Sequence, residues 1–278
     1  LVLGVKSKLT ANNVTIVSGE ASIIDKSTIR CGEETYTCKN LIICTGSETT
    51  IPPIEGVDKV PYWTHREALD NKELPSSLVI VGGGVIGMEF ASFFNSLGVE
   101  VTVVEMLDEI LNGMDKELSA LLRAEYSKRG VTFLLNTQVI SFSGDEKEVR
   151  MSYKNAEGEG ELKAAKLLLS VGRRPVTKGF GLENLNLELT EKGRVKVDEH
   201  MQTSVSGVYV CGDLTGFSLL AHTAVSEAEV AVHSISGKED RMSYRAIPAV
   251  IYSNPELAGV GETEESLQAK GISYIVKK

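Results

Sequence analysis

Short apolar runs of four or five residues alternate with longer amphipathic stretches in the middle of the chain, from residue 77 to residue 135. A short continuous apolar run is typical of a strand buried on both faces, whereas apolar side chains every three or four residues indicate a helix. The pattern predicts a strand, a glycine turn, a helix and a second strand within 77–106, then a helix over 115–130 and a strand over 131–135. Right-handed crossovers would join these strands into a parallel sheet, so we predict a doubly wound α/β domain.

The first predicted helix carries an apolar stripe at spacings of three and four residues, formed by Ile86, Phe90, Phe93, Phe94 and Leu97. Such a stripe predicts the helix face that packs against the sheet. Gly98 follows it, and a glycine in this place commonly ends a helix because it adopts the left-handed conformation at no steric cost.

The flanking regions predict shorter elements. Residues 13–47 predict short strands separated by turn residues, and the two prolines and the glycine of 51–58 predict a connector. The remaining predictions are an antiparallel excursion over 138–171 with a polar turn at NAEGEGE, short strands over 193–214 that end in Cys-Gly-Asp, a helix over 219–237, and a strand-like stretch followed by a helix over 247–278.

Composition narrows the class of protein. The hydrophobic share of 42% and the charged share of 24% are those of an ordinary globular protein long enough for two moderate domains. The net charge of -9 comes from interleaved acidic and basic residues, which disfavours nucleic-acid binding. The chain starts at Leu1, and neither a signal segment nor an apolar run of membrane length follows. We therefore expect a cytoplasmic protein whose N-terminus is missing.

The four cysteines allow two interpretations. Cys31 and Cys38 flank a glycine-containing turn and could face one another as a redox disulfide. Cys44 and Cys211 each end an apolar run, where a small thiol packs like alanine. We favour four inert thiols, because no neighbouring cationic cluster or helix N-terminus is evident that would lower the pKa of a thiol.

The strongest motif is Gly82-Gly83-Gly84-Val85-Ile86-Gly87, which matches G-x-G-x-x-G directly between a predicted strand and a predicted helix. Gly82 would permit the tight turn, Gly84 would let the backbone approach a pyrophosphate, and Gly87 would let helix and strand pack closely. The phosphates would lie at the helix N-terminus, where free N–H groups stabilise anions.

Glu105 ends the second predicted strand, 18 residues after Gly87. A carboxylate in this place accepts hydrogen bonds from the ribose hydroxyls of NAD and repels the 2′-phosphate of NADP. Residues 101–108 contain no lysine or arginine that would attract such a phosphate. The sequence therefore predicts an NAD site, and replacement of Glu105 by alanine should weaken NAD(H) binding.

Several further motifs occur in the order found in the flavoprotein pyridine-nucleotide disulfide oxidoreductases, which the chain resembles over nearly its whole length. They are Cys-Thr-Gly-Ser (44–47), GGGVIGMEF (82–90), Val-Gly-Arg-Arg-Pro (171–175), Tyr-Val-Cys-Gly-Asp (209–213), Leu-Leu-Ala-His (219–222) and the segment 247–265. Within that family, Glu105 and the wording IYSNPE are most similar to the dihydrolipoamide dehydrogenases.

The resemblance implies a three-layer, Rossmann-like fold that binds FAD and NAD. It implies a partial FAD-binding domain (1–74), a complete NAD-binding domain (75–192), a return segment of the FAD domain (193–244) and the start of an α+β dimerisation domain (245–278). It implies NAD contacts at Gly82, Gly83, Gly84, Val85, Ile86, Gly87, Met88, Glu89, Glu105, Val139 and Gly172. It implies FAD contacts at Ala21, Thr45, Gly46, Ser47, Asp213, Leu219, Leu220, Ala221 and His222.

The family reaction passes electrons from protein-bound dihydrolipoamide through a redox disulfide and FAD to NAD⁺. The implied partners of the parent homodimer are the lipoyl domains of 2-oxoacid dehydrogenase or glycine cleavage complexes, with no nucleic acid, membrane or metal. In the family Glu89 pairs with a lysine near the redox disulfide; the alternative here is a glutamate on the helix surface.

Three parts of the family pattern are absent from this sequence. One is the first glycine-rich flavin fingerprint, which the family carries near its N-terminus and which would supply half of the site for the FAD pyrophosphate. No two cysteines have the family's Cys-x4-Cys spacing, and no histidine is followed by proline as in the family's catalytic base. We therefore expect a fragment that keeps NAD binding, binds FAD weakly and does not turn over lipoamide. The alternatives are a related reductase of the NADH oxidase or mercuric reductase type, and a stand-alone dinucleotide-binding or redox-sensing module.

Overall fold

The computed structural model describes residues 2–278 and divides the chain into two compact units, each assembled from two separate segments. Unit 1 comprises Leu1–Ser47 and Pro175–Ser243, and unit 2 comprises Glu48–Arg174 and Tyr244–Lys278. The chain passes from unit 1 to unit 2 within β5 (Ser47–Thr49) and returns to unit 1 within β13 (Arg173–Pro175). These two short strands pair with each other.

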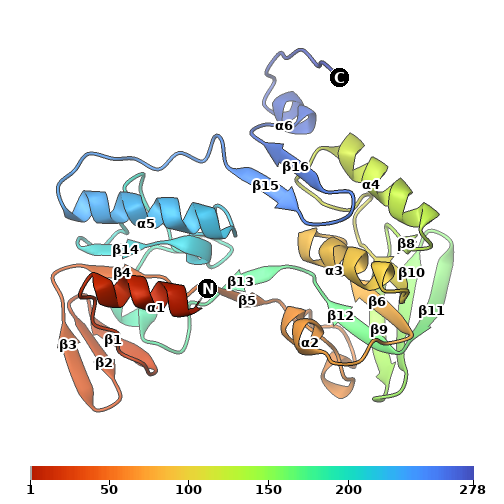
Figure 1. The fold of residues 1–278 in the computed structure, drawn as a ribbon, viewed down its shortest axis with the longest axis horizontal. Coiled ribbons are helices and arrows are strands. Elements are labelled where there is room, and N and C mark those ends of the chain that lie inside the picture. The colour runs from red at the N-terminus through yellow and green to blue at the C-terminus, as the bar shows by residue number, and fades with distance from the viewer. Residues whose placement is uncertain (1) are drawn as a thin grey trace. The chain divides into compact units, whose positions relative to one another are not determined.

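Unit 2 is built on a four-stranded parallel sheet in the order β12-β6-β7-β8 (Figure 1). The strands are β6 (Ser77–Val81), β7 (Glu100–Val104), β8 (Thr132–Leu134) and β12 (Lys166–Leu169), and all three pairings are parallel. The helices α3 (Val85–Ser96) and α4 (Lys116–Lys128) connect the first three strands. The predicted α/β fold is confirmed.

Both faces of this sheet are covered, which explains why its strands are apolar without interruption. Leu78 and Ile80 point to the helix side, where they pack with Phe94 of α3 and Leu122 of α4. The alternate residues Val79 and Val81 pack on the other side, against the antiparallel sheet β9-β10-β11. That sheet consists of β9 (Gln138–Gly144), β10 (Val149–Asn155) and β11 (Gly158–Ala164), and it confirms the predicted excursion.

Helix α3 has the predicted bounds but presents a different face to the sheet. Its buried side chains are Met88, Ala91, Ser92 and Phe94, together with Gly87, whereas Phe93 and Leu97 are 52% and 47% exposed. The predicted apolar stripe is therefore confirmed at Phe94 and, partly buried, at Phe90, but it is wrong at Phe93 and Leu97. Close approach of the helix to the strand requires small residues at Gly87 and Ala91, while the larger Met88 and Phe94 fill the core beside them.

The remaining elements of unit 2 are short. Helix α2 (His65–Asp70) begins with a capping box between Thr64 and Glu67, in a region that the sequence left without an element. The C-terminal segment forms the hairpin β15 (Pro248–Ile251) and β16 (Leu257–Val260), followed by α6 (Glu264–Ala269). This segment was predicted as strand followed by helix, and the hairpin packs against α3 and α4 through Ile251 and Leu257.

Unit 1 contains an antiparallel meander of β1 (Ala21–Asp25), β2 (Thr28–Cys31) and β3 (Glu34–Thr37). A second pair, β4 (Leu41–Ile43) and β14 (Val208–Val210), is parallel. The longest helix of this unit is α5 (Ala221–Ile235), within the predicted range 219–237.

Three regions of unit 1 differ from what the sequence predicts. Residues 14–18 form no strand; they are exposed, and β propensity alone does not make a strand where no neighbour supplies the ladder. Residues 2–11 form helix α1 (Val2–Ala11), which has no buried residue and gave no periodic signal. Within 193–214 the only regular strand is β14; Val195 and Gln202 make isolated bridges instead.

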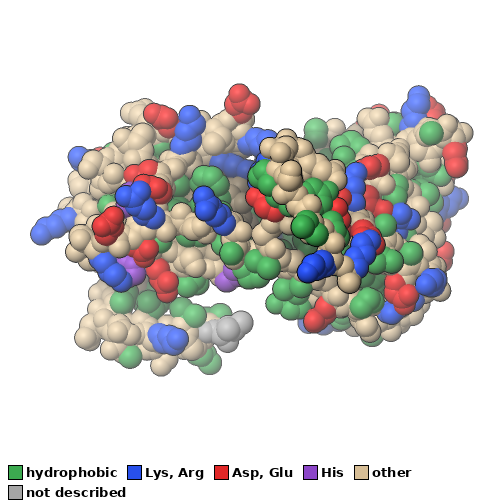
Figure 2. Space-filling model, turned by 90° about the horizontal axis from the view of Figure 1, so that it is seen from above, with side chains coloured by type: hydrophobic (Ala, Val, Ile, Leu, Met, Phe, Trp, Pro, Cys, Tyr) green, Lys and Arg blue, Asp and Glu red, His purple; other side chains and the backbone are tan. Residues whose placement is uncertain are grey.

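The compact units divide the chain at other positions than the predicted domains. Residues 48–74 belong to unit 2, because Trp63 pairs with Leu168 beside the parallel sheet and Ala68 of α2 enters the same core. Among the described residues, no helix is long and apolar enough to cross a membrane. Acidic and basic side chains are interspersed on the face shown in Figure 2.

Candidate functional site

The glycine turn after β6 has the geometry of a tight strand-to-helix connection. Gly82 has φ +104°, and a Cβ placed there would lie 2.5 Å from the carbonyl oxygen of Ser170. A Cβ on Gly87 would lie 2.0 Å from the carbonyl oxygen of Gly82. Only glycine fits at either position, since both contacts are with backbone atoms.

Gly84 differs from its neighbours because a Cβ there would meet no atom within 4 Å. It is the N-cap residue of α3 and provides no side-chain cap, so the first N–H groups of the helix are not satisfied by a cap side chain. Open space in front of a helix N-terminus is suited to an anionic group such as a pyrophosphate.

The carboxylate of Glu105 lies at the same turn. Its Oε2 accepts the backbone N–H of Gly83 at 2.7 Å, and its Oε1 accepts the backbone N–H of Leu107 at 2.9 Å. The structure thus brings together the two halves of the predicted nucleotide site, the glycine turn and the acid. Two backbone contacts fix the carboxylate, and each oxygen retains a lone pair for a ligand hydroxyl.

The turn also lies at the point where the strand order reverses. From β6 the chain continues to β7 on one side, whereas β12 pairs on the other side. In open α/β sheets, ligands bind outside the carboxyl ends of the strands at such a switch point. Ser170, at the end of β12, is buried and donates its hydroxyl to the carbonyl oxygens of Val81 (3.1 Å) and Gly82 (2.9 Å).

Sequence reasoning missed Ser170. A polar residue that ends the apolar run KLLLS is the signal that could have found it, since a buried hydroxyl needs partners. Its position holds the backbone of the glycine turn in place.

The other predicted NAD residues differ in how exposed they are and in where they lie relative to the glycine turn. Val85 is 40% exposed at the start of α3, Ile86 is half-buried, and Met88 is fully buried. Gly172, with φ +118°, follows β12 and accepts the N–H of Thr50 at 3.0 Å through its carbonyl. Val139 lies in β9 and packs on the antiparallel side of the sheet.

Glu89 makes a contact that neither interpretation anticipated. Its Oε1 accepts the backbone N–H of Tyr252 at 2.9 Å. Tyr252 directly follows β15, so in this structure the carboxylate attaches the C-terminal hairpin to α3.

The predicted flavin residues of unit 1 meet where β4 and β14 end. Ser47 donates its hydroxyl to the carboxylate of Asp213, and Thr45 donates to the carbonyl of Val176 at 2.8 Å. Gly46 has φ +72°, and a Cβ there would meet no atom within 4 Å, which leaves the backbone of this turn open. The structure therefore joins the Thr-Gly-Ser and Cys-Gly-Asp turns, as a shared site requires.

Glu227 of α5 is a second residue that sequence reasoning missed. It is fully buried, and its carboxylate accepts the N–H of Gly212 at 2.5 Å and the hydroxyl of Thr215 at 3.2 Å. These bonds fix the Cys-Gly-Asp turn on the helix. A glutamate on the otherwise apolar face of the predicted helix 219–237 was the available signal.

Four further predicted flavin residues lie at the start of α5. Leu220 is its N-cap residue and provides no side-chain cap, and Ala221 and His222 are exposed in the first turn. Leu219 precedes them and is 43% exposed.

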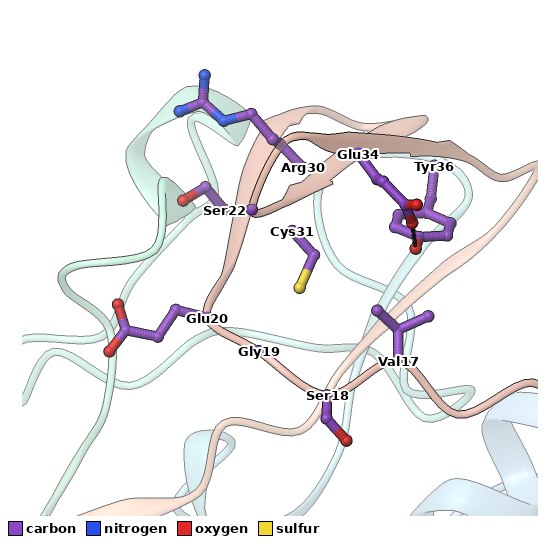
Figure 3. A pocket seen from close by; sticks show the side chains of 10 residues that line it. Val17, Ser18, Gly19, Glu20, Ser22, Arg30, Cys31, Glu34 and Tyr36 are labelled. Carbon is purple, nitrogen blue, oxygen red and sulfur yellow. Dashed lines mark hydrogen bonds between the residues drawn. The ribbon is translucent and has the colours of Figure 1, made fainter.

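Ala21 begins β1, next to a cavity of about 480 Å³ beside the meander (Figure 3). Gly19, Glu20 and Ser22 line the cavity, with Cys31 opposite them. Cys31 pairs with Glu34 and Thr28 with Thr37, so Cys31 and Cys38 lie at opposite ends of the hairpin β2–β3. Both thiols are free, and the hypothesis of a disulfide between them is wrong.

The other histidines have local structural partners. His65 Nδ1 lies 3.1 Å from the hydroxyl of Thr49, and burial together with the charge of Arg173 lowers the pKa of His65. His200 bonds the carbonyl of Asp240 at 2.7 Å, and His233 bonds its carboxylate at 2.6 Å.

A family model described as pyridine nucleotide-disulphide oxidoreductase matches residues 1–228. The chain belongs to this family, which uses flavin and pyridine nucleotide as cofactors.

Among its relatives is the mitochondrial dihydrolipoyl dehydrogenase of Caenorhabditis elegans, 36% identical over 283 residues, which cover 99% of this chain and 57% of that protein. The dihydrolipoyl dehydrogenase of Geobacillus stearothermophilus is 37% identical over 283 residues, covering 99% and 59%. Among solved structures, the Cu(II) complex of the HOCl-induced flavoprotein disulfide reductase RclA from Escherichia coli matches with a TM-score of 0.86 at 28% identity, covering 98% of this chain and 63% of that one. The chain thus spans somewhat more than half the length of the curated relatives it matches.

Proposed function

We propose that the chain is the nucleotide-binding part of an NAD-dependent dihydrolipoamide dehydrogenase. The observation that carries the proposal is the carboxylate of Glu105, fixed at the glycine turn beside the open space over Gly84. A pyrophosphate would accept the free N–H groups at the start of α3, and Glu105 would accept the hydroxyls of the adenosine ribose. A 2′-phosphate in that place would be repelled, which favours NAD over NADP.

The turns of unit 1 are suited to FAD. In the bound state the flavin would carry electrons between the dithiol substrate and the nicotinamide. The open backbone at Gly46 could lie against the cofactor, while the Ser47–Asp213 pair offers a hydroxyl and a carboxylate for its ribityl hydroxyls. Glu227 and Thr215 would hold the second turn in place.

Chemistry on dihydrolipoamide needs a redox disulfide and a base that this sequence does not contain in the family's spacing. The proposed parent is a homodimer that serves the lipoyl domains of a 2-oxoacid dehydrogenase or glycine cleavage complex. The hairpin β15–β16 is the proposed start of its dimerisation domain.

A second candidate is another NAD(P)H-dependent flavoprotein reductase. The match to a solved flavoprotein disulfide reductase over 98% of the chain favours it. The two candidates differ in substrate and share the nucleotide site.

Titration with NADH tests the proposed nucleotide site. The Glu105→Ala variant should bind NADH about 10- to 100-fold more weakly, because charged hydrogen bonds contribute roughly 1.5–3 kcal/mol each. The Glu105→Gln variant should narrow the preference for NADH over NADPH, since it removes the negative charge that faces the 2′ position. The matched control is Glu100→Ala, at the exposed start of β7. Unchanged NADH affinity in Glu105→Ala would rule out the assigned role.

A further inference from the structure

Two cysteines that are far apart in the sequence are neighbours in unit 1. The parallel register pairs Leu41 with Val208 and Ile43 with Val210, and the N–H of Cys211 donates to the carbonyl of Ile43 at 3.2 Å. The next position in this register places Cys44 beside Cys211. Paired strands lie about 4.8 Å apart, which is within the Cα–Cα range of roughly 4.4–6.8 Å that a disulfide spans.

Both side chains leave the same face of the strand pair. Side chains alternate along a strand, so Cys44 shares a face with Ile42, and Cys211 shares a face with Tyr209. Ile42, Tyr209 and Cys211 all pack in the cluster beneath α5, with Val230 and Ala231. The two sulfur atoms are therefore directed to the same side, where each thiol shifts the pKa of the other.

The two thiols differ in exposure and acidity. Cys44 is exposed, whereas Cys211 is 2% exposed. The hydrogen bond from Cys211 lowers the pKa of Cys44 to about 7, against the opposing effect of burial. The hydrogen bond to Cys44, together with burial, raises the pKa of Cys211. The carboxylate of Glu227 on α5 raises the pKa of both thiols. An accessible thiolate next to a buried thiol is the arrangement of an attacking and a resolving cysteine.

We propose that Cys44 and Cys211 form a redox-active pair that undergoes thiol–disulfide exchange with low-molecular-weight disulfides. The Cys44 thiolate, whose proton has gone to solvent, attacks one sulfur of the small disulfide. The bond between its two sulfurs breaks, a mixed disulfide forms on Cys44, and the departing thiolate takes up a proton. Cys211 then loses its proton and attacks the Cys44 sulfur, which releases the second small thiol. One small disulfide is reduced to two thiols, and the two protein thiols are oxidised to one disulfide.

This pair is distinct from the family's redox disulfide, since Cys44 and Cys211 lie 167 positions apart. The new bond would tie together the turn that contains Ser47 and the turn that contains Asp213. In a parallel pair, the Cα–Cβ bonds of neighbouring residues run side by side instead of pointing toward each other. A disulfide between such residues would be strained, so we expect it to be readily reduced.

The test equilibrates the reduced 278-residue chain with mixtures of oxidised and reduced glutathione. After an acid quench, the remaining thiols are alkylated under denaturing conditions and mapped by mass spectrometry. The expected result is loss of two of the four thiols and an unreduced cross-linked peptide that contains Cys44 and Cys211. The double variant Cys31→Ser/Cys38→Ser should give the same cross-link, and Cys211→Ala should retain one glutathione on Cys44.

Two results would overturn the proposal, and both are measured on the unmodified chain. In one, Cys44 and Cys211 stay alkylatable at every glutathione ratio. In the other, glutathione remains on Cys44 while Cys211 stays free.

Discussion

Gly84 and Gly87 lie three residues apart in one turn, yet a methyl group at each would meet different surroundings. At Gly84 it would enter open space with φ at -71°, a value that alanine adopts freely. At Gly87 it would collide with the carbonyl oxygen of Gly82, the residue that begins the glycine turn. The absence of a side chain at Gly84 leaves space for a ligand, whereas at Gly87 it lets helix α3 pack closely against the glycine turn.

These two positions give a matched pair of variants. Gly84→Ala should leave the free energy of unfolding within about 0.5 kcal/mol of the unmodified chain and weaken NADH binding, because the methyl group would occupy the pyrophosphate position. Gly87→Ala should lower the free energy of unfolding by roughly 1–3 kcal/mol or more through overpacking. Urea denaturation and NADH titration measure the two effects. Equal destabilisation by both variants would contradict the distinction.

The acidity of Cys44 leads to a second prediction at this scale. Only the thiolate is alkylated, so the rate of iodoacetamide labelling at Cys44 should rise with pH and reach half its maximum near pH 7. An ordinary thiol reaches this point near pH 8.5. In Cys211→Ala the midpoint should move upward, because the hydrogen bond that lowers the pKa is lost. A midpoint that is the same in both proteins would show that Cys211 does not act on Cys44.

The sequence predicted the glycine turn and Glu105 because their geometry is local: the 29 residues 77–105 contain a strand, the turn, a helix and the next strand. The proximity of Cys44 and Cys211 depends on the pairing of β4 with β14, which no local pattern encodes. Ser170 was missed for the same reason, since the turn that it holds lies 88 positions earlier in the chain. Glu227 bonds Gly212 only 15 positions away, so its role depends on how the turn folds back onto α5.

At the scale of elements, helix α3 shows that sequence periodicity predicts where a helix begins and ends better than it predicts which side chains are buried. Its start, its end and the left-handed Gly98 (φ +82°) agree with the sequence. The buried face agrees only in part, because the small residues Gly87 and Ala91 also face inward. Phe90 and Phe94 contact the core as the stripe predicts, whereas Phe93 remains at the surface.

The hairpin β15–β16 is attached to the helices by a compact set of polar contacts. The buried hydroxyl of Tyr126 in α4 donates to the carbonyl of Asn254 at 3.0 Å and accepts the N–H of Asn254 at 2.9 Å. Arg129 donates to the same carbonyl at 2.6 Å. These contacts from the end of α4 add to those that Glu89 and Ser92 of α3 make with the same hairpin.

The Tyr126→Phe variant should release this hairpin. Because Arg129 and Ser92 still bond Asn254, we expect a loss of about 1 kcal/mol and faster amide exchange over residues 248–260. The matched control is Tyr274→Phe, whose hydroxyl bonds Gln268 at the surface. Unchanged exchange in Tyr126→Phe would show that apolar packing alone holds the hairpin.

At the scale of the whole molecule, the two compact units have separate cores. The cores of unit 2 lie on the two faces of its parallel sheet, and those of unit 1 lie on the two sides of β4 and β14. The proposed NAD residues all lie in unit 2 and the proposed FAD residues all lie in unit 1. If the proposed residues bind the nucleotide, NADH binding should require only unit 2.

The 278-residue chain should bind NADH without reducing lipoamide, even when FAD is supplied. No cysteine pair has the family's spacing and no histidine precedes a proline, so the dithiol step has neither its disulfide nor its base. Absorbance at the NADH band follows the reaction, with a full-length dihydrolipoyl dehydrogenase as positive control. NADH-dependent turnover above the enzyme-free rate would contradict the prediction.

The passage of the chain out of unit 1 at residue 47 and back at residue 175 has a consequence for synthesis on the ribosome. Strand β4 emerges long before β14, its neighbour, whereas residues 48–174 contain all four strands of the parallel sheet. Once that stretch has folded, the bond from Thr50 to Gly172 holds its two ends together. Residues 48–174 then act as a short loop between the two segments of unit 1. A short loop lowers the entropy cost of bringing those two segments together.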